Sequence, residues 1–219
     1  DTLAHEMMHR WGPKVSFIKN GQPSDQLIGK ESNHWSYFLN SNASLMYGSD
    51  WKDLEDGTFV TQNIRHSLSP LDLYLMGMKA AAEVPPFFLI ENGVPGDATD
   101  IPPSIGTTVT GTKLSVDINN VIAAEGPRIP DVSESQHAFN FHFVLLKRPE
   151  DVVDTKDIGR LLVLQRQFQT RFHVETSGIG SIHYSENDPV AGQNATLNYD
   201  YNLRPNYEIN LAKQFLFDH

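Results

Sequence analysis

The chain contains no cysteine among its 219 residues. Disulfide bonds are therefore excluded, and so are thiolate zinc sites and a cysteine nucleophile. Any bound metal ion must be held by histidine, aspartate or glutamate side chains. Long hydrophobic runs are also missing: no apolar stretch approaches the ~20 residues that a membrane-spanning helix needs, so we expect no transmembrane segment.

Positive charge is scarce as well. The chain has 17 lysines and arginines against 27 aspartates and glutamates, which gives a formal net charge of −10. The basic residues are scattered rather than clustered, and this argues against nucleic acid as a partner. Hydrophobic residues make up 39% of the chain, enough to build a core. A chain of this length fits one domain, with room for a small second module.

The first residues carry a metal-binding pattern, His5-Glu6-Met7-Met8-His9. On a helix, positions i and i+4 lie on the same face, so both imidazoles can reach one ion. Zinc accepts two such nitrogens and needs at least one more protein ligand, which leaves a position for water. Glu6 can point at that water and take its proton as the hydroxide attacks a carbonyl. The alternative is a coincidental pattern on an amphipathic helix.

Gly12 extends the pattern to H-E-x-x-H-x-x-G. This resembles the metzincin branch of the zincin metallopeptidases, in which the glycine turns the chain and a third histidine, three residues further on, reaches the metal. Val15 occupies that position here and cannot bind a metal. The resemblance therefore points to His34, after an insertion, as the third zinc ligand. Asp72 is the rival, because another zincin branch uses a downstream aspartate; otherwise we expect Asp72 to be a buried carboxylate that orients a ligand histidine.

Two further segments resemble metzincins. Residues 44–48, Ser-Leu-Met-Tyr-Gly, look like the Met-turn, which implies that Met46 forms an apolar floor beneath the metal. Residues 69–77 look like the helix that follows the Met-turn. The resemblance covers roughly residues 1–78 and extends to a group of secreted bacterial proteins assigned as metallopeptidases. It implies a location that is secreted, periplasmic or on the bacterial cell surface.

Other side chains offer further candidates. Tyr47 or Tyr74 could donate a hydrogen bond to an oxyanion, although burial in the core is the commoner fate of a tyrosine. Four acidic residues could hold calcium, but their spacing misses the EF-hand pattern: Asp50, Asp53, Glu55 and Asp56. Five histidines stand alone and are expected at the surface or in satisfied core positions: His66, His137, His142, His173 and His183.

Periodicity and capping residues predict a mixed α/β fold. Four helices are expected: residues 1–11, residues 69–77 with Ser69 as N-cap, residues 117–124, and residues 155–173 with Thr155 as N-cap. Strands are expected at six places, including a strand pair and a strand that becomes fully buried: residues 15–18, 34–39, 58–61 and 87–90, the pair at 107–114, and the buried strand at 139–146. Residues 50–57 are expected to form an acidic loop.

The resemblance implies a zincin-like catalytic domain at residues 1–185. From residue 186 the composition turns to asparagine, aspartate, proline and tyrosine, which predicts a linker or the start of a following β module at residues 186–219. Because zincin peptidases place a β-sheet before the motif helix, this chain is expected to lack that N-terminal sheet. An upstream segment or another chain would then complete the domain. Without it, we expect an apolar face of the first helix to be exposed around Leu3, Met7 or Met8.

These observations predict a zinc-dependent peptidase acting on proteins or peptides. Glu6 is the expected general base, and the expected zinc ligands are His5, His9 and His34. The alternative is a catalytically inactive peptidase-like module, kept for binding or scaffolding, in which zinc is structural or absent. The valine in place of the usual third histidine favours that alternative.

Overall fold

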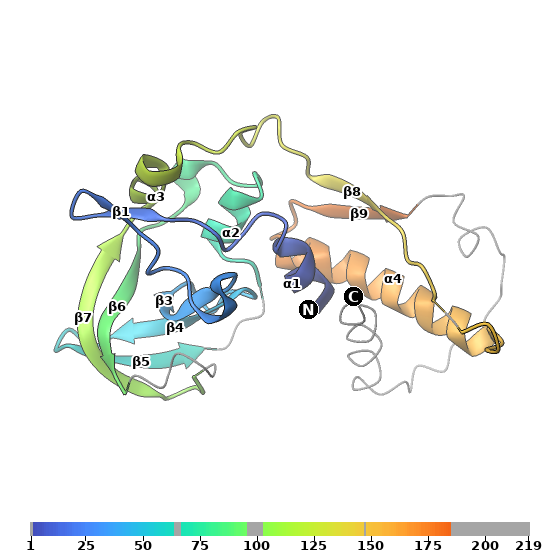
Figure 1. Ribbon diagram of the computed structural model, residues 1–219, viewed down its shortest axis with the longest axis horizontal. Coiled ribbons are helices and arrows are strands. Elements are labelled where there is room, and N and C mark those ends of the chain that lie inside the picture. Colours follow the sequence, from blue (N-terminus) through green and yellow to red (C-terminus); the bar gives the residue numbers. More distant parts are fainter. Residues whose placement is uncertain (1, 64–66, 96–102, 147, 185–219) are drawn as a thin grey trace.

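The computed structural model describes residues 2–63, 67–95, 103–146 and 148–184. The fold is mixed α/β, as the sequence predicts, but its main feature is a closed five-stranded barrel that the sequence does not reveal. The barrel lies on one side of the molecule, and helices α1 and α4 with the small sheet β8-β9 lie on the other (Figure 1). No helix within the described ranges is long and apolar enough to cross a membrane.

The barrel strands follow the order β3-β4-β5-β7-β6. Their bounds are β3 (Trp35–Asn40), β4 (Tyr47–Asp53), β5 (Thr58–Asn63), β6 (Phe87–Val94) and β7 (Thr108–Val116). Large side chains on these strands, such as Trp35, Trp51 and Phe59, are buried and belong to one hydrophobic cluster, whose removal from water stabilises the fold. β3 and β6 pair at a single position, Leu39 with Leu89, and we call this sparse contact the barrel seam.

Two expectations about this region are wrong. Residues 50–53 belong to β4 rather than to an acidic loop, because Trp51 is buried in the barrel and Lys52 pairs with Val60 on β5. Residues 107–114 do not form a strand pair. Nearly all of them lie in the single strand β7. One edge of β7 pairs with β5 and the other with β6, so there is one long strand in place of two short ones.

Short elements precede the barrel strands in the sequence, separate β5 from β6, or follow β7. They are β1 (Phe17–Lys19) and β2 (Gln22–Ser24), the 3-10 helices η1 (Lys30–Ser32) and η2 (Ala81–Glu83), and the helices α2 (Pro70–Leu75) and α3 (Ile118–Glu125). The predicted cap of α2 is confirmed. The Ser69 side chain accepts from the N–H of Asp72, the Asp72 side chain accepts from the N–H of Ser69, and Pro70 stands at the start of the helix.

The last described elements are β8 (Ala138–Phe141), α4 (Thr155–Glu175) and β9 (Ser181–Tyr184). The N-cap of α4 is Asp154, not Thr155, because the Asp154 carboxylate accepts from the N–H groups of Lys156 and Asp157. The buried strand expected at residues 139–146 is also wrong in its second half. β9 pairs only as far as Phe141, and beyond it Val144 and Leu146 are 65% and 67% exposed.

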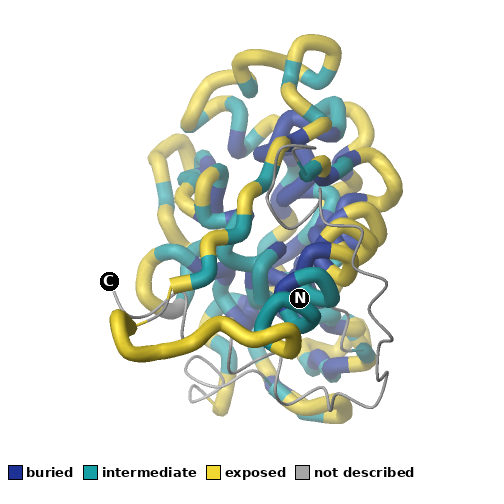
Figure 2. The backbone as a smooth tube through the Cα atoms, turned by 90° about the vertical axis from the view of Figure 1, so that its right-hand side faces the viewer, coloured by how far each residue is buried: buried dark blue, intermediate teal, exposed yellow. Residues whose placement is uncertain are grey.

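Helix α1 (Thr2–Met8) does not present an open apolar face. Met8 and Ala4 are buried, while Leu3 and Met7 are half-buried and pack against the core, so the expected exposure is wrong for Met8. Figure 2 shows α1 coloured as buried or partly buried along its described length. Phe168 and Phe172 of α4 belong to the same hydrophobic cluster, which extends from the barrel to α1. The module expected at residues 186–219, together with His66, lies outside the described residues.

Candidate metal centre

Helix α1 places two histidines one turn apart. The rings of His5 and His9 have centroids 4.9 Å apart and are perpendicular to each other. α1 ends at Met8, whose carbonyl accepts from the N–H groups of Trp11 and Gly12, so His9 stands in the turn that closes the helix. The i, i+4 spacing in the sequence therefore yields the neighbouring imidazoles that it predicts.

His34 joins them from the residue just before β3. Its ring centroid is 5.1 Å from that of His5 and 4.9 Å from that of His9. One ring nitrogen from each of the three lies within 4.8 Å of the others, and the Nε2 atoms of His5 and His34 are 3.1 Å apart. His34 is buried, with 5% exposure. The structure thus brings together the three histidines that the sequence singles out as candidate ligands.

The hydrogen bonds of the rings favour metal binding. The Nδ1 atom of His5 lies 2.8 Å from the carbonyl oxygen of Leu45, and because a carbonyl only accepts, Nδ1 carries the proton and Nε2 has a free lone pair. The Nδ1 atom of His9 is buried and has no hydrogen-bond partner within the described residues. The Nδ1 atom of His34 lies 3.9 Å from the Glu31 carboxylate, and its Nε2 atom is the one that faces His5. Three imidazole nitrogens that face one another are a donor set that zinc accepts.

Burial and neighbouring charge also keep a proton off His9. The pKa of His9 is lowered from 6.5 to about 4, chiefly because burial disfavours the charged ring and secondarily because His5 and His34 lie close by. Lys14 lowers it further, whereas Glu31 acts in the opposite direction. His9 is therefore neutral at pH 7, which is the protonation state that can bind a metal ion.

Asp72 lies in a separate, closed network. Its carboxylate accepts hydrogen bonds from Trp35 Nε1 at 2.7 Å, from the Ser44 hydroxyl at 2.5 Å and from the Ser69 N–H at 2.7 Å. Complete burial raises the pKa of Asp72, and these hydrogen bonds act against that rise. The carboxylate is not part of the histidine group, so the geometry favours His34 over Asp72 as the third ligand.

The network supports the histidines indirectly. Trp35 directly follows His34, and Ser44 directly precedes Leu45, whose carbonyl holds His5. Asp72 thus ties together the two segments that position those rings, although none of its hydrogen bonds reaches a histidine. The expected buried supporting carboxylate is present in this indirect form. Its links to Trp35 and Leu45 could not be read from the sequence, because they depend on which backbone segments meet in space.

The segment that resembles a Met-turn makes a tight turn beside the site. Met46 is fully buried, and its carbonyl accepts from the Trp35 N–H at 2.9 Å. Tyr47 and Gly48 both have positive φ angles, 73° and 74°, and a Cβ atom on Gly48 would collide with the Ser41 side chain. Glycine is therefore required here, and the strained Tyr47 is held in a conformation that is uncommon for a bulky residue.

The two tyrosine candidates have different surroundings. Tyr47 stacks on His34, with centroids 4.3 Å apart and an interplanar angle of 19°, and its ring also lies 5.6 Å from that of His5. Tyr74 is buried, and its hydroxyl accepts from the Arg128 N–H at 3.0 Å. Of the two, Tyr47 is the one whose ring contacts the histidines.

The remaining candidates do not form a second site. Across the described ranges, the three histidines are the only group of three or more metal-binding side chains, so the calcium expectation for Asp50, Asp53, Glu55 and Asp56 gains no support. Asp53 instead pairs with Lys113 at 3.1 Å. His137 and His173 are hydrogen-bonded to the backbone carbonyls of Gly77 and Gly180, as expected of isolated histidines.

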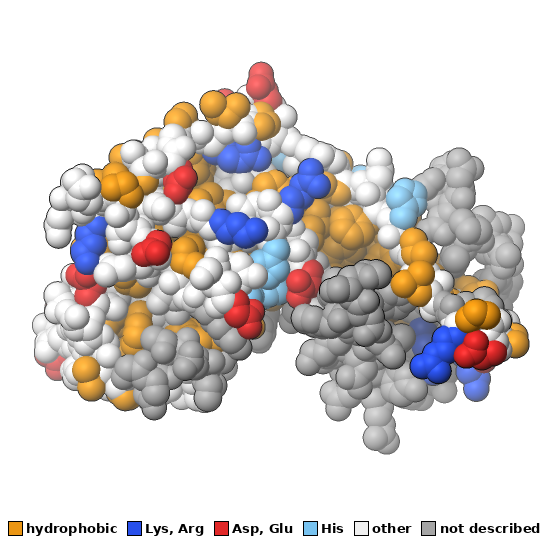
Figure 3. All heavy atoms as spheres, in the orientation of Figure 1, with side chains coloured by type: hydrophobic (Ala, Val, Ile, Leu, Met, Phe, Trp, Pro, Cys, Tyr) orange, Lys and Arg blue, Asp and Glu red, His pale blue; other side chains and the backbone are white. Residues whose placement is uncertain are grey.

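Histidine side chains reach the molecular surface beside α1, with acidic and basic side chains around them (Figure 3). Figure 3 also shows an apolar area between α1 and the β8-β9 sheet. Comparison with protein-family models, with curated proteins and with solved structures gives no match to the chain. Membership of the zincin class therefore stays a prediction, and a functional conclusion depends on the geometry of the histidine cluster.

Proposed function

We propose that the protein is a zinc-dependent peptidase of zincin type. The proposal depends on one observation above all: His5, His9 and His34 present ring nitrogens within 4.8 Å of one another, from a helix and from a segment 25 residues or more further along the chain. Glu6 stands on the same helix between the first two histidines and is only partly buried. Two of the proposed ligands and the proposed general base thus belong to one sequence motif, and His34 would be the third ligand.

His5, His9 and His34 would hold the zinc ion. Bound there, zinc would supply a lowered pKa for a water molecule, towards ~7, and would polarise a substrate carbonyl. Glu6 would accept the proton of the attacking water and pass it to the leaving amine. Tyr47, whose ring stacks on that of His34, would donate a hydrogen bond to the oxygen of the substrate carbonyl as negative charge develops on it. Substrates would be proteins or peptides met outside the cytoplasm.

The direct test combines metal content with hydrolysis. The purified protein should contain one zinc ion per chain by elemental analysis and should cleave casein. 1,10-phenanthroline should abolish the cleavage, and added zinc should restore it. Stoichiometric zinc without any cleavage would leave the metal site standing and refute the peptidase. A protein that neither retains nor takes up zinc would refute both.

One observation favours a second candidate function, a peptidase-like module that binds or scaffolds without catalysis. The Nε2 atoms of His5 and His34 lie at hydrogen-bonding distance, 3.1 Å, so these two rings can satisfy each other without a metal ion. In that case the protein should remain folded and functional in binding after exhaustive chelation. Thermal denaturation measured with and without chelator separates the two, since a bound zinc ion stabilises the folded state by mass action.

A further inference from the structure

One lysine beside the candidate metal centre has no ionic partner. Lys14 lies on the segment between α1 and β1, shortly after His9 in the sequence, and is exposed. Among the described residues Lys14 forms no ion pair, whereas other basic side chains do: Lys19, Lys79, Lys113, Arg160 and Arg171. In a chain with a formal net charge of −10, an unpaired cation at this position is a group that can attract an anionic ligand.

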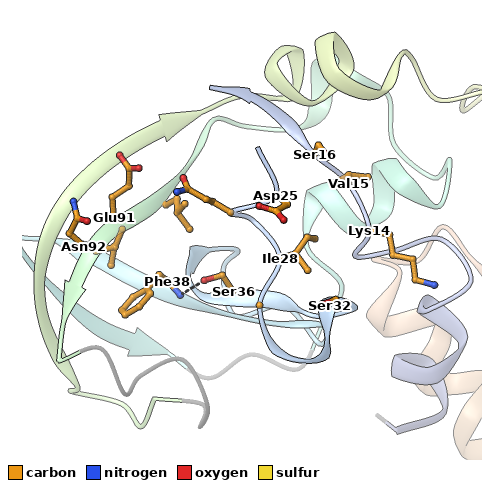
Figure 4. A pocket seen from close by; sticks show the side chains of 14 residues that line it. Lys14, Val15, Ser16, Asp25, Ile28, Ser32, Ser36, Phe38, Glu91 and Asn92 are labelled. Carbon is orange, nitrogen blue, oxygen red and sulfur yellow. Dashed lines mark hydrogen bonds between the residues drawn. The ribbon is translucent and has the colours of Figure 1, made fainter. Parts of the chain in front are cut away.

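The fold places Lys14 between the motif helix and the segment that carries His34. Lys14 and Ser32 lie at the same end of a cavity of about 640 Å³ beside the barrel seam (Figure 4), and Ser32 precedes His34 by two residues. Figure 4 shows the Lys14 side chain extending away from the other lining residues, towards the side on which α1 lies. The lining includes none of the three histidines, so Lys14 stands at the border between this cavity and the histidine cluster.

The charge of Lys14 acts on the cluster. Burial is the main cause of the lowered pKa of His9, the two neighbouring histidines come next, and Lys14 contributes with the same sign. Glu31 acts in the opposite direction, and its carboxylate lies 3.9 Å from Nδ1 of His34. The cluster is thus bordered by one cation and one anion, and of these the anion already faces a histidine.

Arg10 is a second basic residue next to the cluster, but its charge is engaged. Its guanidinium carbon lies 5.7 Å from the centroid of the Trp11 ring. At this distance a cation is attracted to the face of an indole ring. Of the two cations, Lys14 is therefore the better placed to bind a ligand.

We propose that Lys14 binds an acidic side chain of the peptide substrate, an aspartate or a glutamate close to the scissile bond. The proposal rests on the peptidase function proposed above and adds to it the class of sequence that is cleaved. Exposed charges are screened beyond about 8 Å at physiological ionic strength, so the ammonium near the site outweighs the remote carboxylates that make the chain negative. An exposed ion pair changes affinity by about twofold to fivefold, which gives a preference and not a strict requirement.

A binding test separates this selection from catalysis. The Glu6→Gln protein is loaded with zinc, immobilised and exposed to a peptic digest of dephosphorylated casein, and mass spectrometry identifies the bound and unbound peptides. Peptides with aspartate or glutamate should be retained about twofold to fivefold better than peptides with lysine or arginine. Adding Lys14→Glu should invert this preference. Lys14→Arg should keep it, because the positive charge remains.

Lys52→Glu is the matched control. Lys52 is exposed on β4 and does not line the cavity, and its substitution changes the net charge by the same amount as Lys14→Glu. It should leave the preference as it is.

Four binding results would overturn the proposal. They are no retention of any peptide, the same preference with and without Lys14→Glu, and equal loss of preference in Lys14→Glu and Lys52→Glu, which would assign the selection to overall charge. The fourth is retention that ignores aspartate and glutamate but is lost when the peptides are methyl-esterified. That result would indicate recognition of the C-terminal carboxylate.

Hydrolysis gives an independent readout in the protein with Glu6 intact. Cleaved bonds in the same peptides should have aspartate or glutamate nearby more often than uncleaved bonds. Lys14→Glu should raise KM for such peptides about fivefold, with kcat and zinc content unchanged, because the ion pair contributes equally to binding of the substrate and of the transition state. Selective retention without any hydrolysis would keep Lys14 as a binding residue and refute the peptidase. Hydrolysis at the same bonds in Lys14→Glu would refute the role of Lys14 and retain the peptidase.

Discussion

The Asp72 network and the histidine cluster are neighbouring groups of polar side chains. They differ in whether all their polar atoms have hydrogen-bond partners within the protein. The Asp72 carboxylate receives three hydrogen bonds, from Trp35, Ser44 and Ser69, and is completely buried. The histidine cluster, one residue away from Trp35 in the sequence, contains a buried nitrogen on His9 without a partner among the described residues. A closed network of this kind stabilises a fold, whereas an open one has binding capacity left for a ligand.

The first prediction concerns the substitution Glu6→Gln beside the histidine cluster. If the open cluster is catalytic, this variant should lose about 10²–10⁴-fold in casein hydrolysis, because the amide has nearly the shape of the carboxylate but cannot accept the proton of the attacking water. Zinc content, measured by elemental analysis, should stay the same. Near-normal hydrolysis by the variant would remove Glu6 from the general-base role and with it the centre of the peptidase proposal.

The second prediction compares His34→Ala with Asp72→Ala. His34→Ala should leave the protein without zinc after dialysis, since two histidines do not complete a zinc site. Asp72→Ala should retain zinc at an affinity lowered by about 10–100-fold, as is usual when a group that orients a ligand is lost. Zinc titration with a competing chelator measures both. The reverse pattern would make Asp72 the third ligand and would contradict the geometry described above.

The closed cluster should matter more for stability. Asp72→Ala leaves the indole N–H of Trp35 and the backbone N–H of Ser69 buried without their acceptor, and each such loss costs about 1–3 kcal/mol. Asp157→Ala is the matched control, because Asp157 occupies the same position in the capping box of α4 but is partly exposed. It should cost about 1 kcal/mol or less. Urea denaturation of the two variants measures the difference, and equal costs would show that the buried network adds nothing.

The smallest expected effect is on the pH dependence of folding stability, to which His9 and Asp72 contribute with opposite signs. In the metal-free protein, the folded-state pKa of His9 is about 4 against 6.5 when unfolded, so the unfolded chain takes up the proton first. Stability should therefore be lost as the pH falls from about 6.5 to about 4. The raised pKa of Asp72 acts oppositely: its contribution is present at low pH and is lost as the pH rises from 3.8 through the raised value.

The measurement is the denaturation midpoint of the metal-free protein at several values of pH between 4 and 7, alone and with His9→Gln or Asp72→Asn. Removing the histidine should make the loss of stability on acidification shallower. Removing the charge of Asp72 should make that loss steeper, because the opposing contribution is gone. If both variants change the slope of the midpoint against pH in the same direction, then His9 and Asp72 do not have pKa values shifted in opposite directions by folding.

Local sequence determined the elements whose causes lie within a few residues. The spacing of His5 and His9 on one helix face, the cap of α2 at Ser69 and the α-helical stripe of α4 all depend on neighbours three or four positions apart, and the structure contains each of them. The misplaced cap of α4 is an error of one residue, of the kind that helix boundaries commonly produce. The mixed α/β class followed from the same local patterns.

The tertiary structure sets the features that depend on contacts between residues far apart in the sequence. It closes five strands into a barrel through the pairing of β5 with β7 and of β3 with β6, strands that lie far apart in the sequence. It brought His34 to the motif helix and assigned Asp72 to Trp35 and Ser44, although both residues looked like candidate ligands in the sequence. The sequence specifies which side chains can donate, accept or bind a metal ion. Which of these groups come into contact depends on how the whole chain packs.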